Sequence, residues 1–288
     1  MQLPSTGPVD ALLEEAHALF AAGSFAEAGN RLERALPMST GDPARHREIC
    51  GDLAVVAAAD GRYDEATAIA TQVLEAEAGH PGALEVLAHC TQAREQLAGA
   101  EALSREIQAA RVEQFMRLST CTRVLGDPVR TQAVQFVGLG RVTLGHNVQF
   151  GWPSSPGFYS GYAYVEARNR QTHIEIGENV VFNNSPVLIG EGPGIRIGAE
   201  TLFGPSIQIM DTDAHDLHPR RRHGGKIETA HVDIGRNVFL GSSVIVTKGV
   251  TIGDDTVVGA ASVVTKSLPA GVIAGGNPAR VIRELDYD

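Results

Sequence analysis

The residues best suited to chemistry lie together in residues 210–223, which hold three aspartates, three histidines and three consecutive arginines. Imidazole titrates near neutral pH, so a histidine in this stretch could take a proton from a reacting hydroxyl group. Three converging neutral imidazoles could instead bind zinc. The stretch therefore favours either proton transfer or metal chemistry.

This stretch interrupts a sequence pattern with a period of six. Aliphatic residues recur without a gap at Ile234, Leu240, Val246, Ile252, Val258 and Val264. The same step links Ile176, Phe182 and Leu188, then Ile197, Phe203 and Ile209, and more weakly Leu144 and Phe150. From Ile209 to Ile234 the distance is 25 residues where six is due, an excess of 19. The chemistry-bearing residues are therefore predicted to lie on a long loop, a common place for function.

The period of six itself predicts the element that carries this loop. Neither a helix of 3.6 residues per turn nor a lone alternating strand repeats at six. Three faces of six residues make a triangular coil of about 18, with the aliphatic residue inside and glycine or asparagine turning the corner. Stacked coils predict a parallel β-helix from about residue 132.

A different pattern occupies residues 9–118. Apolar residues there recur at three- and four-residue spacing between glycine-containing turns, which predicts helices. Residues 23–28 (GSFAEA) match residues 61–66 (GRYDEA) at a period of 38. This resembles the tetratricopeptide repeat, whose period is roughly 34, so about two degenerate units are expected. Such a region could bind a protein partner or could be a cap that supports oligomer packing.

Composition places the boundary between these patterns. Residues 1–120 hold 18 acidic and 9 basic side chains (net −9), and residues 121–288 hold 16 and 15 (net −1), which together account for the net charge of −10. We expect a helical domain at 1–118, a linker at 119–131 and the β-helix at 132–288. The acidic balance argues against nucleic acid as a partner.

The rest of the composition bears on location. No apolar stretch approaches the roughly 18 residues of a membrane span, and no secretion signal is recognisable at the start of the chain. The three widely spaced cysteines argue for a reducing compartment. A cytoplasmic protein is expected.

Four segments carry a family resemblance: 233–243 (DIGRNVFLGSS), 249–254 (GVTIGD), 261–266 (ASVVTK) and 275–283 (GGNPARVIR). With them, residues 132–288 resemble the hexapeptide-repeat acyltransferases with a left-handed β-helix, in the maltose, galactoside and polysaccharide O-acetyltransferase branch. One departure is Phe239, where the family usually has tryptophan. The resemblance implies an acetyl-CoA-dependent transfer of an acetyl group to a sugar hydroxyl, in the biosynthesis of a cell-surface polysaccharide or a glycoside.

The resemblance also assigns catalytic roles. His215 corresponds to the general base, with His218 as the second candidate, and the backbone N–H of Ser242 corresponds to an oxyanion donor. Asn184, or alternatively Asn183, corresponds to an asparagine that holds the acceptor or the base. An aspartate at 211, 213 or 216 could orient the imidazole, and the sequence leaves that choice open.

The family's donor site maps onto six residues, with the first four along the pantetheine arm and nearby phosphates and the last two near the nucleotide: Ser242, Ala260, Thr265, Lys266, Arg280 and Arg283. Cationic side chains suit the phosphates of coenzyme A. The family forms trimers with active sites shared between subunits, so a homotrimer is expected. No dinucleotide-binding or phosphate-loop motif occurs in the chain.

Three other interpretations remain at this point. The first is N-acetylation of an amino sugar. The second is a zinc protein resembling gamma-class carbonic anhydrases, in which His218 and His223 would be joined by His173 or His231; the neighbouring arginines disfavour it, and no metal is expected. The third is a non-catalytic assembly protein. Residues 156–166, with three of the five tyrosines, could stack a sugar but more simply close an imperfect coil.

Overall fold

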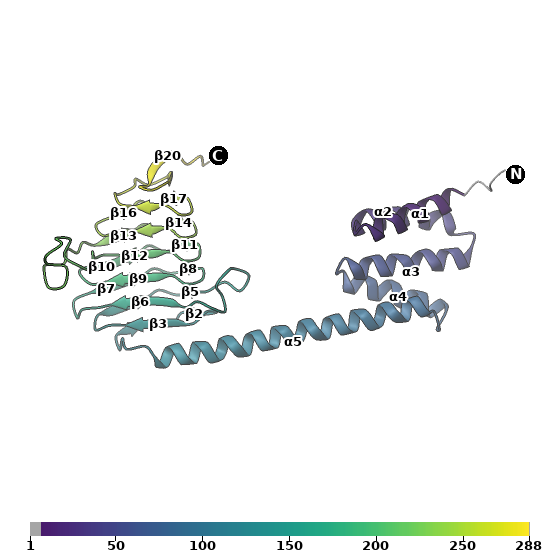
Figure 1. Cartoon of the computed structure of the whole chain (residues 1–288), viewed down its shortest axis with the longest axis horizontal. Coiled ribbons are helices and arrows are strands. Elements are labelled where there is room, and N and C mark those ends of the chain that lie inside the picture. The colour runs from purple at the N-terminus through teal and green to yellow at the C-terminus, as the bar shows by residue number, and fades with distance from the viewer. Residues whose placement is uncertain (1–6, 288) are drawn as a thin grey trace. The chain divides into compact units, whose positions relative to one another are not determined.

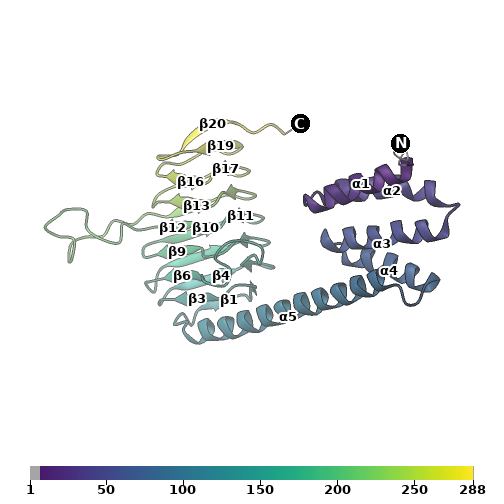
Figure 2. The same cartoon turned by 45° about the vertical axis from the view of Figure 1, so that its right-hand side comes forward.

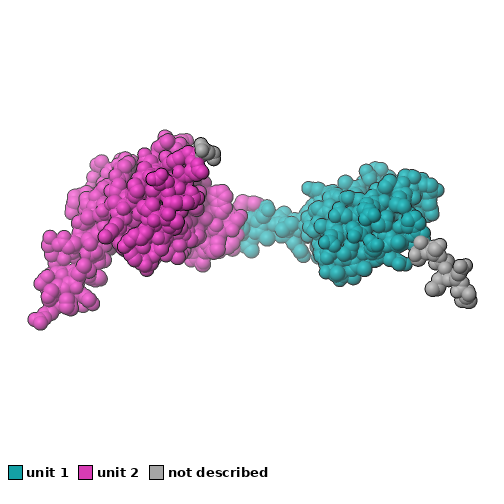
Figure 3. Space-filling model, turned by 90° about the horizontal axis from the view of Figure 1, so that it is seen from above, with its two compact units in different colours: residues 1–104 teal, residues 105–288 magenta. Residues whose placement is uncertain are grey.

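The computed structural model describes residues 7–287. It divides into two compact units, Met1–Ser104 and Arg105–Asp288 (Figure 3). None of the helices within the described residues is long and apolar enough to cross a membrane.

The first unit is helical and contains α1 (Pro8–Ala21), α2 (Phe25–Ala35), the short 3₁₀ helix η1 (Leu36–Ser39), α3 (Pro43–Ala59), α4 (Tyr63–Ala76) and the beginning of α5 (Pro81–Arg117). α1 packs against α2 and α3 against α4. Each pair turns at a glycine, Gly23 or Gly61, with a φ of +78° that favours glycine. In both turns the residue after the glycine donates its N–H to the carbonyl five positions back, the bond that closes a Schellman motif.

The repeated alanines explain how closely these helices pack. Ala28 and Ala66 are fully buried, each in one of two separate apolar clusters. The predicted helical hairpins are therefore confirmed. A larger side chain at either alanine would separate the helices of its pair.

The second unit stacks short strands into coils, and its strands are β1 (Val124–Leu125), β2 (Val129–Arg130), β3 (Val134–Val137), β4 (Arg141–Leu144), β5 (Gln149–Phe150), β6 (Ala163–Ala167), β7 (His173–Ile176), β8 (Val181–Phe182), β9 (Val187–Gly190), β10 (Gly194–Ile197), β11 (Leu202–Phe203), β12 (Gln208–Met210), β13 (Val232–Ile234), β14 (Phe239–Leu240), β15 (Ile245–Val246), β16 (Thr251–Ile252), β17 (Val257–Val258), β18 (Val263–Val264), β19 (Val272–Gly275) and β20 (Arg280–Glu284). Successive strands go to three different sheets (Figure 1). The first sheet runs β1-β4-β7-β10-β13-β16, the second β2-β5-β8-β11-β14-β17-β19-β20 and the third β3-β6-β9-β12-β15-β18. All neighbours are parallel except β19 and β20. These three sheets are typical of the predicted left-handed β-helix.

The six-residue pattern forms the core of this unit. The aliphatic residues at its repeating positions are buried. Phe150, Phe182 and Phe203 stack in successive coils, with ring centroids 4.8 and 4.6 Å apart. The core is therefore a continuous column, in which each coil covers the apolar residues of the next.

Glycine occupies its positions in the six-residue pattern for a reason other than the predicted turning of corners. A Cβ atom on Gly241 would lie 2.7 Å from the backbone nitrogen of Ala260 in the next coil. The corners are turned instead by residues in the left-handed region, among them Asn179 and Asn237 at one corner and Ser206 and Ser243 at another. Glycine is required because neighbouring coils approach closely at that position.

The stretch expected to be a linker, residues 119–131, contains two strands of the β-helix. β1 pairs with β4, and β2 pairs with β5. The first coil therefore begins before residue 132. The six-residue pattern did not predict this coil, because its two-residue strands lack the buried aliphatic residue of the repeat. Their residues are exposed or half-buried.

Candidate active site

The histidine loop, residues 211–231, leaves the coil between β12 and β13 and projects from the β-helix (Figures 1 and 2). Its base is closed by two backbone hydrogen bonds, from Ala230 N–H to the Asp211 carbonyl (2.9 Å) and from Asp213 N–H to the Glu228 carbonyl (3.1 Å). The predicted excursion is confirmed. Of the loop, only residues 211–213 and 228–230 pair with each other, as a two-stranded stem.

His215 is exposed just beyond this stem. Its Nδ1 lies 3.3 Å from the backbone carbonyl oxygen of Arg222. Because a carbonyl only accepts, Nδ1 must carry the proton of the neutral ring. Nε2 is left with a lone pair, as a general base needs.

His218, the second candidate base, has the opposite arrangement. Its Nδ1 accepts a hydrogen bond from the Arg220 N–H at 3.2 Å. The proton of the neutral ring is therefore on Nε2. Of the two histidines, His215 is therefore the better placed to accept a proton at Nε2.

None of the three aspartates is hydrogen-bonded to His215. Asp211 is buried and accepts the backbone N–H groups of Glu191, Gly192 and Gly194 at 2.7–3.0 Å. Asp213 forms an ion pair with Lys248 at 2.8 Å. The group that orients the imidazole is the carbonyl of Arg222, which no side-chain pattern in the sequence could reveal.

Asp216 holds the outer part of the loop. Its buried carboxylate accepts the His218 N–H at 2.8 Å and Arg221 Nε at 2.9 Å. The hydrogen bond from His218, followed by that from Arg221, keeps the pKa of Asp216 below its usual value. This carboxylate is therefore charged near neutral pH and stabilises the turn after His215.

The proposed site residues divide between two edges of the triangular coil. We call the turns from the third sheet to the first the histidine edge, because His215 lies there, and Thr265 and Lys266 follow β18 on the same edge. We call the turns from the second sheet to the third the serine edge, which carries Asn184, Ser242 and Ala260. The fold thus separates the residues assigned to one reaction.

The serine edge presents a free backbone donor. Ser242 is exposed, and none of the described residues accepts a hydrogen bond from its N–H. Its carbonyl accepts the Ala261 N–H of the next coil at 2.8 Å. One coil earlier, Pro205 occupies the same turn position, between Gly204 and Ser206. The Ser242 N–H is therefore available to an oxyanion and is not needed by the turn.

Asn184 has a structural role in this chain. Its side chain is fully buried, and Nδ2 donates to the carbonyls of Trp152, Ser155 and Pro156 at 2.9–3.1 Å. Its Oδ1 accepts the Trp152 N–H at 2.9 Å. Neither Asn183 nor Asn184 has a positive φ, because Ser185 turns that corner. The amide of Asn184 therefore holds the loop between β5 and β6.

That loop, residues 151–162, contains much of the aromatic stretch. Phe158 is buried, and its carbonyl accepts hydrogen bonds from Gln108 and Gln132. The Tyr162 ring packs on Phe115 of α5 with centroids 4.4 Å apart. These contacts support the structural interpretation of the tyrosine-rich stretch over sugar stacking.

The cationic residues assigned to the donor are all exposed: Lys266, Arg280 and Arg283. Arg280 and Arg283 lie on β20, beside β19 at the end of the second sheet. The guanidinium groups of Arg280 and Arg283 donate to the backbone carbonyls of Ala279 and Glu284 at 2.7 and 3.1 Å. Their charges fit a polyanionic ligand at this end of the coil.

The zinc interpretation finds no support in residues 7–287, where no group of three or more His, Cys, Asp or Glu side chains could hold a metal ion. His173, one candidate ligand, is hydrogen-bonded through Nε2 to Thr143 at 2.9 Å.

Comparisons with known proteins agree with this architecture. Residues 231–266 match the family model described as the hexapeptide repeat of succinyl-transferase. Nodulation protein L of Rhizobium leguminosarum bv. viciae is 38% identical over 177 residues, which cover 61% of this chain and 85% of that protein. Galactoside O-acetyltransferase of Escherichia coli K12 is 35% identical over 115 residues, 40% of this chain, and the match spans only 56% of that relative's length.

Among solved structures, a galactoside acetyltransferase in complex with coenzyme A is 25% identical and has a TM-score of 0.36, over 66% of this chain and 82% of that one. The match to nodulation protein L covers most of that relative, and the three-sheet coil and the hexapeptide model agree with it. The chain therefore belongs to the hexapeptide-repeat acetyltransferase family.

Proposed function

We propose that this protein is an acetyl-CoA-dependent O-acetyltransferase that acts on a hydroxyl group of a sugar or glycoside, with His215 as the general base. The observation that carries the proposal is the hydrogen bond from His215 Nδ1 to the Arg222 carbonyl, which leaves Nε2 unprotonated on an exposed ring. The sugar acceptor is taken from the names of the relatives.

The chain's own groups account for each proton and charge of this transfer. His215 Nε2 removes the hydroxyl proton as the acceptor oxygen forms a bond to the thioester carbonyl carbon. The N–H of Ser242 donates to the oxygen that becomes negative in the tetrahedral intermediate. When the carbon–sulfur bond breaks, the imidazolium of His215 returns the proton to the leaving thiolate, and the acetyl ester remains on the acceptor.

Coenzyme A would supply the activated acetyl group as a thioester. Its arm would follow the turns at Ser242, Ala260 and Thr265, which are exposed. The cations Lys266, Arg280 and Arg283 would bind its phosphates.

We also propose that the protein is a trimer in which the histidine edge of one copy meets the serine edge of the next. This arrangement would unite His215 with Ser242, which lie on different edges of one coil. For the helical unit, with its two similar hairpins, we propose a tetratricopeptide-like surface that binds a protein partner.

The test of the enzymatic proposal is release of free thiol from acetyl-CoA with a panel of glycosides. His215→Ala should reduce turnover by roughly 10²–10⁴ fold, the usual contribution of a general base. His223→Ala, an exposed histidine of the same loop, is the matched control and should keep full activity.

Full turnover by His215→Ala would refute the proposed base, and no thiol release with any acceptor would refute the transferase. The product distinguishes O- from N-acetylation, because mild alkali cleaves an acetyl ester and leaves an amide intact.

A further inference from the structure

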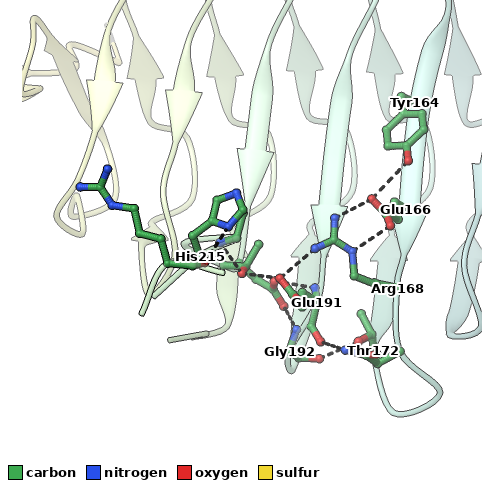
Figure 4. Close-up of polar contacts among 12 residues, drawn as sticks. Tyr164, Glu166, Arg168, Thr172, Glu191, Gly192 and His215 are labelled. Carbon is green, nitrogen blue, oxygen red and sulfur yellow. Dashed lines mark hydrogen bonds and ion pairs between the residues drawn. The ribbon is translucent and has the colours of Figure 1, made fainter. Parts of the chain in front are cut away.

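A network of charged side chains leads across the third sheet to the histidine loop (Figure 4). Arg168 donates to Glu166 through Nε (2.9 Å) and Nη2 (3.0 Å), and through Nη1 it forms an ion pair with Glu191 at 2.9 Å. Tyr164 donates its hydroxyl to Glu166 Oε2 at 3.2 Å, the oxygen that also accepts from Arg168. One guanidinium therefore joins two carboxylates from neighbouring coils.

The network continues into the loop through one hydroxyl. Thr212 Oγ1 donates to Glu191 Oε2 at 2.7 Å and accepts the Ala214 N–H at 2.9 Å. Ala214 has a φ of 59°, an unusual conformation for alanine, and His215 is the next residue. Thr212 is therefore a fixed point shortly before the base, held by Glu191, and Asp213 beside it is fixed separately by Glu228 and Lys248.

Strand register explains how these residues meet. Ala167 pairs with Gly190, and Ile189 pairs with Met210. Continuing that register places Arg168, Glu191 and Thr212 at the same position of three successive coils, on the histidine edge. They are 23 and 21 residues apart in the sequence, yet stacking brings them into one column.

Burial makes the arginine necessary to this arrangement. The side chains of Glu166 and Glu191 are only 12% and 13% exposed. Without Arg168, two largely buried carboxylates would face each other with no cation between them, and one would be driven to protonate or turn away. Glu191 would then no longer hold the Thr212 hydroxyl in place.

We propose that Arg168, Glu191 and Thr212 are positioning residues, which fix the backbone of residues 212–214 and thereby the place of the His215 imidazole. The inference rests on His215 being the base of the proposed function. It gives Arg168 and Glu191, which the sequence patterns do not single out, a part in the reaction without contact with the reacting atoms.

The test compares two substitutions of one hydroxyl group. Thr212→Val keeps the shape of the side chain but removes both hydrogen bonds, whereas Thr212→Ser keeps the hydroxyl. Displacing a catalytic group by about 1 Å can cost on the order of 100-fold in rate. We therefore expect Thr212→Val to lower kcat by roughly 10- to 100-fold with an unchanged KM for acetyl-CoA, and Thr212→Ser to restore most of kcat.

A second pair of variants tests the arginine. Arg168→Met should lower kcat in the same way as Thr212→Val. Arg196→Met removes an ion pair with Asp233 on the first sheet and is the matched control, which should keep wild-type kcat. Melting temperatures measured on all variants separate lost positioning from lost folding.

The inference is overturned if folded Thr212→Val and Arg168→Met keep wild-type kcat, or if Thr212→Ser is as impaired as Thr212→Val. Should Arg168→Met fail to fold, the Val and Ser pair at Thr212 decides alone. If His215→Ala retains full turnover, the proposed function fails first. If His215→Ala is inactive while Thr212→Val is fully active, only the positioning inference fails.

Discussion

The backbone N–H of Ser242 is not needed to form the turn in which it lies. At the same turn position one coil earlier the chain has Pro205, which has no N–H to donate, and the turn there is completed by a left-handed serine as it is after Ser242. The fold therefore does not need a donor at this position. The N–H of Ser242 is therefore free to serve as the proposed oxyanion donor.

This comparison makes Ser242→Pro a specific test of the oxyanion donor. The variant should fold, because Gly204-Pro205-Ser206 already makes the same turn in this chain. Loss of one oxyanion donor typically costs about 10²–10³ fold in kcat. Steady-state kinetics of thiol release and a melting curve measure the two effects.

Ser242→Ala keeps the N–H and serves as the control, which should remain active. A fully active and correctly folded Ser242→Pro would exclude this N–H from the reaction.

At the scale of the elements, the coil positions the site and two loops interrupt it. The histidine loop is anchored by its own backbone stem and by the column at Thr212. The loop of residues 151–162 is held from inside by Asn184, whose amide protons go to that loop's carbonyls. The family resemblance assigns Asn184 to holding the acceptor or the base, but in this structure its side chain holds the loop of residues 151–162.

Asn184→Ala should consequently change stability. Removing a buried amide leaves carbonyls and one N–H of the loop without partners, at a cost of about 1–3 kcal/mol in the free energy of unfolding. Denaturant titration measures this loss, and proteolysis should show earlier cleavage within residues 151–162. Gln208→Ala, exposed on the third sheet, is the control.

A folded Asn184→Ala protein with unchanged stability and lost turnover would instead favour a direct role of Asn184 in binding the acceptor.

At the scale of the whole molecule, the proposed site residues lie on two separate edges of the coil. His215, Thr265 and Lys266 belong to one edge, and Ser242 and Ala260 to another. A triangular coil is rigid because its interior is fully packed, so it cannot bend one edge toward the other. This separation favours a site shared between copies, since a second copy can supply the missing edge, and the number of three copies comes from the family resemblance.

Mixed trimers test this arrangement directly. His215→Ala and Ser242→Pro should each be inactive alone, but trimers assembled from equal amounts of both should regain about a quarter of the wild-type rate, because each site draws one edge from each of two neighbours. Thiol release after co-refolding measures the recovery.

Light scattering on the unmixed protein should give the mass of three chains. Mixed samples that stay inactive, or a monomeric mass, would contradict the shared site.

The six-residue period was enough to predict the β-helix, the buried aliphatic column and the place of the histidine loop, because each depends on residues near one another in sequence. The pairing of glycine turns likewise predicted the helical hairpins. What the sequence left open were the polar contacts: the Arg222 carbonyl beside His215 within the histidine loop, the column of Arg168, Glu191 and Thr212 across three coils, and the loop bonds of Asn184. The contacts between coils depend on how many residues each coil contains, since one extra residue in a turn changes which side chains stack. Only the tertiary structure, by setting that register, decided that the proposed base and the oxyanion donor lie on different edges of the coil.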